Sequence, residues 1–183
     1  MRQFDYSYLA DRTWDNEIIS YISKIHEYKG KQELYLRQKP VELNRLIEIA
    51  KIQSTEASNR IEGIITTNAR LKQLVADKTT PKNRDEEEIL GYRNVLNLVH
   101  ENYDVIPVRS NYILQLHRDL LKYTNLNYGG QFKTTPNEID MVLESGEKVV
   151  LFKPLEPYET PDAVDAICEE YQKALDKELV DEL

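Results

Sequence analysis

Ser58 and Glu62 have types and a spacing that could support chemistry. They lie four residues apart in an expected helix, so their side chains share one face, and Gly63 follows as a helix-ending residue. A carboxylate in the last turn of a helix meets the negative end of the helix dipole, which costs up to about 1 kcal/mol unless a cation or donor compensates. Glu62 is therefore either a solvated side chain before an ordinary cap, or a carboxylate held ready for an arginine or a nucleotide-site donor.

The three histidines do not form a metal or acid-base site. His26, His100 and His117 are far apart in the sequence, and none has a second ligand at helical spacing. We expect His117 to be a half-buried side chain with one hydrogen bond. The six glycines are dispersed except for one adjacent pair, so the sequence contains no glycine-rich phosphate loop. No catalytic residue and no metal ligand is predicted in this chain.

Helices must position these residues, because apolar side chains recur at helical spacing through the first two thirds of the sequence. The expected helices cover residues 15–28, 41–62, 66–76 and 84–103, and a further helix is capped by Ser110. Gly30 is expected to end the first helix. The inward face of the second helix is expected to consist of Leu43, Leu46, Ile47, Ala50, Ala57 and Ile61.

A β-hairpin is expected after the helices. Residues 131–142 and 148–152 predict two strands, joined by a turn at residues 144–147. Thr160 is expected to cap a last helix, with Pro161 at its first position. The sequence thus predicts one mainly α-helical domain with a protruding hairpin.

Composition limits the class of protein. The chain has 183 residues, 40% hydrophobic residues and a mean hydropathy of -0.61, which is typical of a globular protein. We expect no membrane segment and no export signal, and therefore a cytoplasmic location. Cys168 is the single cysteine, which excludes an internal disulfide and suits a reducing compartment.

Negative charge is concentrated in the last quarter of the chain. Residues 138–183 contain 14 acidic and 4 basic side chains, within a net charge of -8 for the whole sequence. Such a surface repels phosphate backbones, so nucleic acid is not an expected partner. A charge run of this kind is usually a solvated helix face.

The segment Ser58-Asn59-Arg60-Ile61-Glu62-Gly63 matches the motif (S/T)xxxE(G/N). That motif is the inhibitory motif of Fic proteins, Fido-fold enzymes that transfer AMP from ATP to protein hydroxyls. Residues 88–94 resemble a family helix, residues 113–121 resemble the helix before the target-binding flap, and residues 129–139 resemble the flap. The resemblance covers about residues 41–175, and it implies a Fido-like helical bundle with a β-hairpin flap.

The resemblance also implies roles for individual residues. Glu62 would be the inhibitory glutamate, Ser58 its helix-positioning companion and Gly63 the end of the motif. The flap would bind a protein substrate by strand addition, and its second half would border the nucleotide together with Glu62. The residues that would contact the target protein are Gly130, Gln131, Phe132, Lys133, Thr134 and Thr135. Those that would border the nucleotide are Asn137, Glu138, Ile139 and Asp140. Lys133 stands where many relatives have arginine, which keeps the charge but loses the planar fork.

One element of the family pattern is missing from the sequence. Fic enzymes carry HPFx(D/E)GNGR, in which the histidine is the general base and the acidic residue holds Mg²⁺; no such segment occurs here. We therefore expect an N-terminal helical extension at residues 1–40 and a partial Fic domain at residues 41–183, which ends before the catalytic loop. ATP and Mg²⁺ would serve the parent enzyme, and this chain alone would be inactive and bind neither tightly.

Two functions remain open. The chain is either the regulatory and target-binding portion of a self-inhibited AMP-transferase that modifies Tyr, Thr or Ser hydroxyls, or a non-enzymatic, antitoxin-like module. The module would supply an inhibitory glutamate or a hairpin edge to a protein partner. If part of the bundle is missing, the apolar faces around Ile113, Leu116, Leu120, Ile167 and Tyr171 are uncovered, and a homo-oligomer is possible.

Overall fold

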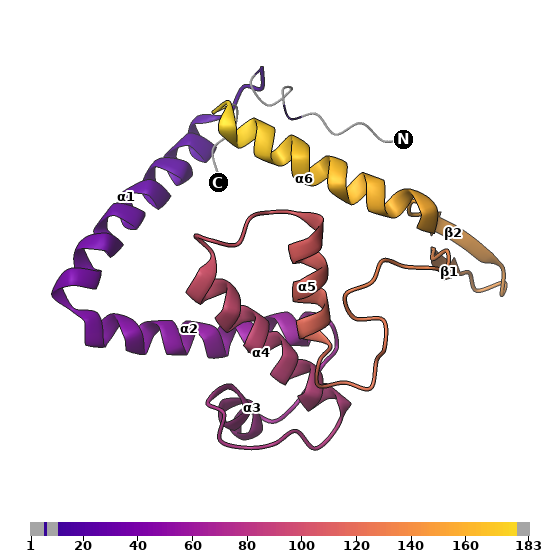
Figure 1. The fold of residues 1–183 in the computed structure, drawn as a ribbon, viewed down its shortest axis with the longest axis horizontal. Coiled ribbons are helices and arrows are strands. Elements are labelled where there is room, and N and C mark those ends of the chain that lie inside the picture. Colours follow the sequence, from indigo (N-terminus) through magenta and orange to yellow (C-terminus); the bar gives the residue numbers. More distant parts are fainter. Residues whose placement is uncertain (1–5, 7–10, 179–183) are drawn as a thin grey trace.

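The computed structural model describes residue 6 and residues 11–178. The expected mainly helical fold is confirmed: six α-helices and a two-stranded antiparallel hairpin make up the described part of the chain (Figure 1). The helices are α1 (Asn16–Gln38), α2 (Pro40–Ile61), α3 (Asn68–Val75), α4 (Arg84–Asn102), α5 (Ser110–Leu120) and α6 (Thr160–Asp176). The strands are β1 (Ile139–Val142) and β2 (Lys148–Phe152), and a short 3-10 turn, η2 (Pro157–Glu159), precedes α6.

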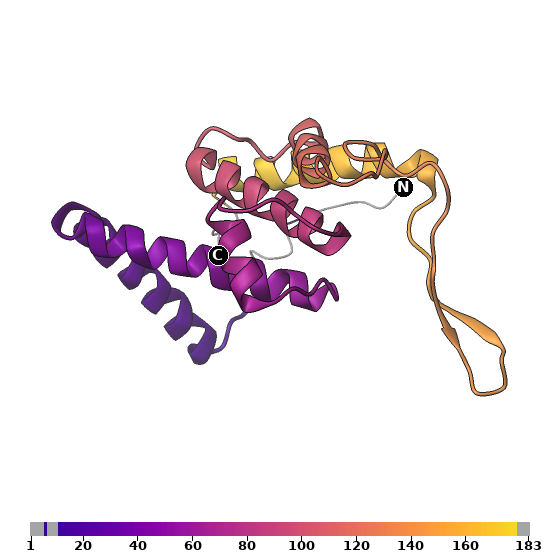
Figure 2. The same ribbon diagram turned by 90° about the horizontal axis from the view of Figure 1, so that it is seen from below.

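The helices pack around α4, which contacts α2, α3 and α5, while α6 lies against α5. Leu71, Leu74 and Ile89 form a small buried cluster between α3 and α4. α1 and α2 form a V, and α1 has no buried residue. The hairpin projects away from the helices (Figure 2), and only Asp140 in its strands is partly buried. No helix in residues 11–178 combines the length and apolar character needed to cross a bilayer.

Local sequence explains how three of the helices begin. Asp15 caps α1 by accepting a hydrogen bond from the Ile18 N–H at 2.8 Å. Asn83 caps α4 in the same way, through the Glu86 N–H at 3.0 Å. Pro40 opens α2 at a position where a helix needs no N–H donor.

Several expected boundaries are wrong. α1 does not end near Tyr28 but continues to Gln38, with Gly30 in its interior. Ser110 and Thr160 are the first residues of their helices, not the caps, which are Arg109 and Glu159 without a side-chain cap bond. The hydroxyl of Thr160 instead donates to the Glu156 carbonyl at 2.9 Å.

The inward face expected for α2 and the length expected for the first strand are also wrong. α2 buries the polar side chains Thr55 and Asn59, whereas Leu46 and Ile61 are exposed. The Thr55 hydroxyl and the Asn59 amide each donate to a carbonyl four residues back in the helix, at 2.7 and 2.8 Å, so their burial leaves these donors satisfied. The first strand covers residues 139–142 only, since residues 131–138 pair with no other strand among the described residues.

Candidate functional site

Ser58 lies in the last turn of α2 and Glu62 directly follows that turn, where the helix ends in a complete Schellman motif. Gly63 adopts a φ of 77°, and its N–H donates to the Arg60 carbonyl at 3.1 Å. The Ile64 N–H donates to the Asn59 carbonyl at 2.8 Å, which closes the motif. Glu62 is therefore the C-cap residue, next to the carbonyl groups that carry the negative end of the helix dipole.

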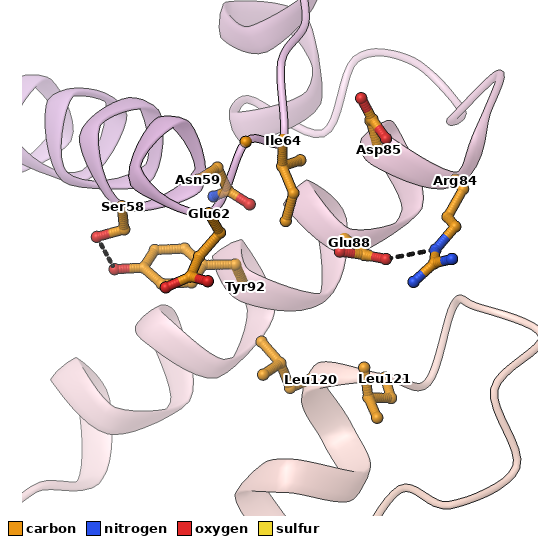
Figure 3. A pocket seen from close by; sticks show the side chains of 11 residues that line it. Ser58, Asn59, Glu62, Ile64, Arg84, Asp85, Glu88, Tyr92, Leu120 and Leu121 are labelled. Carbon is orange, nitrogen blue, oxygen red and sulfur yellow. Dashed lines mark hydrogen bonds and ion pairs between the residues drawn. The ribbon is translucent and has the colours of Figure 1, made fainter. Parts of the chain in front are cut away.

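Ser58 connects this turn to α4. The Tyr92 hydroxyl donates to Ser58 Oγ at 2.9 Å, and both side chains are partly buried (Figure 3). A side-chain hydrogen bond between two helices fixes their relative rotation and typically contributes about 1 kcal/mol. The contact therefore holds the end of α2, and with it Glu62, in a defined position relative to α4.

Ser58 and Glu62 line an open cleft of about 680 Å³ between α2, α4 and α5. Figure 3 shows the side chains that surround it, with Glu62 on the α2 side and Leu120 and Leu121 on the α5 side. The remaining lining residues come from the end of α2 and the first half of α4: Asn59, Gly63, Ile64, Arg84, Asp85, Glu88 and Tyr92.

The charges of the cleft are mostly negative. Three carboxylates, from Glu62, Asp85 and Glu88, line it with one guanidinium, that of Arg84. Arg84 Nε lies 2.7 Å from Glu88 Oε1, and this hydrogen-bonded carboxylate raises the pKa of Arg84. The Glu62 carboxylate has no hydrogen bond or ion pair within residues 11–178. The cleft is therefore suited to a cationic group, and its lining disfavours a triphosphate.

An ion pair between the partly buried Arg70 and the buried Glu86 fixes the start of α4 next to the cleft. The Arg70 guanidinium donates to both Glu86 oxygens, at 2.9 and 2.5 Å, and Glu86 also accepts from the Lys82 N–H and the Thr66 hydroxyl. These bonds, that from Arg70 first, lower the pKa of Glu86 to about 2 despite its burial. Arg70 also bonds Thr79 and Thr80, so the loop before α4 is attached to α3.

Gly91 sets the distance between α4 and α5. A Cβ atom built on it would lie 1.8 Å from the Leu120 carbonyl oxygen, so only glycine permits this crossing. The close approach places Leu120 and Leu121 at the edge of the cleft. No sequence pattern pairs residue 91 with residue 120.

The first residues of the predicted flap pack against α5. The Gly130 N–H donates to His117 Nδ1 at 3.3 Å, and a Cβ at Gly130 would lie 2.9 Å from Arg118 Cβ. His117 is half-buried and makes this hydrogen bond, as predicted. The backbone at residues 129–130 is thus packed closely onto α5, with Gly130 at a φ of 77°.

Beyond Gly130 the flap leaves the helices. Gln131, Thr134 and Thr135 are exposed, Phe132 and Lys133 are half-buried, and Lys133 Nζ donates to Asn137 Oδ1 at 2.6 Å. Asp140 pairs with Lys148 across the hairpin at 2.5 Å. Asn137, Glu138, Ile139 and Asp140 do not line the cleft that contains Glu62, so the structure does not bring the predicted nucleotide residues into one site.

No protein-family model and no curated protein matches the sequence. A solved structure does: the crystal structure of a Fic domain containing signaling protein from Bacteroides thetaiotaomicron VPI-5482 is similar to 78% of this chain, with a TM-score of 0.65 and 25% sequence identity. The chain has a Fic-like fold. It spans 53% of the length of that structure, about half.

Within this Fic-like fold, the sequence analysis singled out Ser58, Glu62 and the flap as candidate site residues, but it did not identify Tyr92, which bonds Ser58, or the Arg70–Glu86 pair, which holds the start of α4. Tyr92, Arg70 and Glu86 come from other helices, 16 to 34 residues away in the sequence from the groups they contact. Local spacing does not encode such contacts. Sequence composition gives no signal for the Arg70–Glu86 pair, because Glu86 stands in a run of charged residues from Arg84 to Glu88.

Proposed function

We propose that this chain is the regulatory and target-binding portion of a self-inhibited Fic protein, which transfers AMP from ATP to Tyr, Thr or Ser hydroxyls of a protein. The observation that carries the proposal is the position of Glu62: a carboxylate on the negative end of a helix, directed into an acidic cleft and without a partner in the described residues. The Fic-like fold and the matched signaling protein support it.

Glu62 would act by pairing with an arginine from the catalytic part of the parent protein. The dipole of α2 disfavours the carboxylate by up to about 1 kcal/mol where it stands. A guanidinium entering the cleft would relieve this cost and form a charge-assisted, directional pair. The arginine so engaged would be withdrawn from the γ-phosphate, which would prevent productive placement of ATP.

The residues present do not fit ATP and Mg²⁺ by themselves. No group of three or more His, Cys, Asp or Glu side chains that could hold a metal occurs in residues 11–178. The cleft also has three carboxylates against one paired arginine. We therefore assign no chemical step to this chain, and propose that it regulates and selects targets.

The hairpin would hold the target protein. In a two-stranded sheet each strand keeps one free edge, and the backbone groups on that edge can pair with an extended segment of another chain. Anchoring of Gly130 on α5 would keep the base of the flap in place while its outer part receives the target.

The test uses the complete coding sequence, including whatever follows codon 183. Transfer of AMP from labelled ATP to the protein itself or to lysate proteins is compared for the natural sequence, Glu62→Gln and Glu48→Gln. Glu48 is a matched control because it is an exposed glutamate on α2 outside the cleft. We expect Glu62→Gln to raise labelling at least about tenfold, which corresponds to about 1.4 kcal/mol of lost inhibition, and Glu48→Gln to leave it unchanged. Equal labelling by all three proteins would contradict the proposal.

A binding module without enzymatic activity is the second candidate. The observation that favours it is the hairpin, whose apolar residues Val142, Val150 and Leu151 are more than half exposed. The 183-residue sequence also contains no HPFx(D/E)GNGR motif. The two candidates differ in the coding sequence after codon 183. A downstream HPFxxGNGR motif supports the enzyme, and a stop codon supports the module.

A further inference from the structure

The exposed face of α1 carries a repeat that the proposed function does not use. Ile18, Tyr21, Ile25 and Tyr28 alternate at spacings of three and four residues, and Gln32 and Tyr35 continue the pattern. This spacing is that of the seam of a left-handed coiled coil, with positions a (18, 25, 32) and d (21, 28, 35). The four apolar side chains are 36 to 64% exposed, and α1 buries none of its residues.

We propose that two copies of this chain associate through α1, as an antiparallel helix pair. The inference is independent of the proposed function. A polar residue at a single a position, here Gln32, helps to set the register of a seam at some cost in stability. The overlap is then centred near Ser23, with Ile18 opposite Tyr28 and Tyr21 opposite Ile25 of the second copy.

The charges beside the seam select the second copy and its direction. Lys24 and Lys31 border it, since their ammonium groups lie 5.8 and 5.3 Å from the ring centroids of Tyr21 and Tyr28. In the antiparallel register, Glu17 faces Lys31 of the second copy at both ends of the pair, and Ile22 faces Ile22. In a parallel pair Lys24 would face Lys29 twice. Charge complementarity therefore favours the antiparallel arrangement, although Lys24 meets its own counterpart at the centre.

The seam is large enough for a weak dimer. An aromatic side chain buries about 150–250 Å², and Tyr21 and Tyr28 are still 53 and 64% exposed. With Ile18 and Ile25 this leaves about 300–400 Å² per copy, so the pair covers roughly 700 Å² before flanking residues are counted, in the range of weak, transient interfaces. The contacts that Glu17 and Lys31 now make, with Tyr21 and Glu27, are exposed and cost little to rearrange.

Sedimentation equilibrium of the 183-residue chain over a concentration series tests the apolar seam. We expect a reversible dimer that Ile25→Glu weakens at least about tenfold, because each copy would place a charge in the seam. Ile19→Glu is the matched control: Ile19 is on the same helix and equally exposed, at 50% against 45%, but lies off the seam. It should leave the dimer unchanged. Circular dichroism verifies that both variants keep their helix content.

Charge exchange tests the register. Glu17→Lys or Lys31→Glu alone converts attractive pairs into repulsive ones and should weaken its own dimer about three- to tenfold, whereas a mixture of the two variants should recover the natural affinity. A chain that stays monomeric would overturn the proposal and would indicate that another segment or protein covers α1. Equal loss with Ile19→Glu, or no recovery in the mixture, would also overturn it.

Discussion

Glu86 shows how a single buried side chain can organise a local region. It is 4% exposed, yet each of its oxygens accepts at least two hydrogen bonds, from Arg70, Thr66 and Lys82. A buried carboxylate is costly unless it is paired and bonded in this way. Its partners come from three segments of the chain, so the position of Glu86 fixes α3, the following loop and the start of α4 together.

This carboxylate predicts an acid-sensitive stability. The folded-state pKa of Glu86, about 2, lies below its ordinary value of 4.5. Its contribution is thus fully present above about pH 4.5 and is lost as the pH falls toward 2, on the order of 2 kcal/mol in the free energy of unfolding. Urea unfolding followed by circular dichroism at several pH values measures this loss.

The control for the pH prediction is Glu86→Gln. The variant should be less stable than the natural chain near neutral pH, because Arg70 would lose its charged partner. Its stability should also decline less between about pH 5 and pH 2. If the two proteins showed the same decline, Glu86 would not be its source.

Among the candidate site residues, the sequence predicted the structure only of those whose conformation depends on their immediate neighbours. Ser58, Glu62 and Gly63 were predicted correctly as the end of a helix because their spacing and the glycine are sufficient to define one. Tyr92 could not be predicted as the partner of Ser58, because a contact between residues 34 apart depends on how two helices cross. The sequence motif therefore predicted the position of Glu62 on its helix but not what fixes that helix in space.

Helix boundaries were likewise predicted correctly where neighbouring residues determine them and wrongly where they do not. The limits of α2 and α4 were predicted almost to the residue because Pro40, Gly63 and Asn83 act on their own neighbours. α1 was predicted ten residues too short because Gly30 was interpreted as a stop. A glycine inside a helix costs only about 1 kcal/mol, and nothing lies within 4 Å of its Cβ position here. The first strand was predicted eight residues too long, because residues 131–138 favour an extended conformation but have no partner strand among the described residues.

Glycine 91 and glycine 30 give opposite predictions for the same substitution. Gly91→Ala should lower the free energy of unfolding by about 2 kcal/mol, because the new Cβ meets the Leu120 backbone and α4 and α5 must separate. Gly30→Ala should raise it by up to about 1 kcal/mol through better helix propensity in open space. Thermal unfolding compares both with the natural chain. A Gly91→Ala protein as stable as the natural one would show that the crossing is not tight.

The helices and strands differ greatly in how closely they pack against the rest of the molecule. α3 and α4 enclose the buried cluster, whereas α1 and the hairpin stand away from it. Of the five apolar residues expected to be uncovered, Ile113 on α5 and Ile167 on α6 are 43 and 36% exposed, whereas Leu116, Leu120 and Tyr171 are half-buried. The net charge of -8 opposes non-specific association of these apolar surfaces, so any dimer depends on local complementarity.

Rates of backbone hydrogen exchange should reflect these differences in packing. Backbone amides of the hairpin, residues 139–152, should exchange nearly as fast as those of an unfolded peptide, because an isolated two-stranded hairpin is only marginally stable. Amides around Ile89 and Leu90 in α4 should be protected up to the global free energy of unfolding. Mass spectrometry of peptic fragments measures both segments in one sample. A hairpin as well protected as α4 would mean that another surface covers it.

The left-handed backbone at Gly63 explains why the motif (S/T)xxxE(G/N) ends with a choice between two residues. Glycine and asparagine are the residues that most readily adopt this conformation at the end of a helix. The last motif position therefore specifies where the helix stops rather than any contact with a ligand. Since Glu62 precedes that stop, the same position determines which residue presents its carboxylate at the cleft. In a distant relative, the glycine or asparagine would thus locate the glutamate of the motif even where the other positions have diverged.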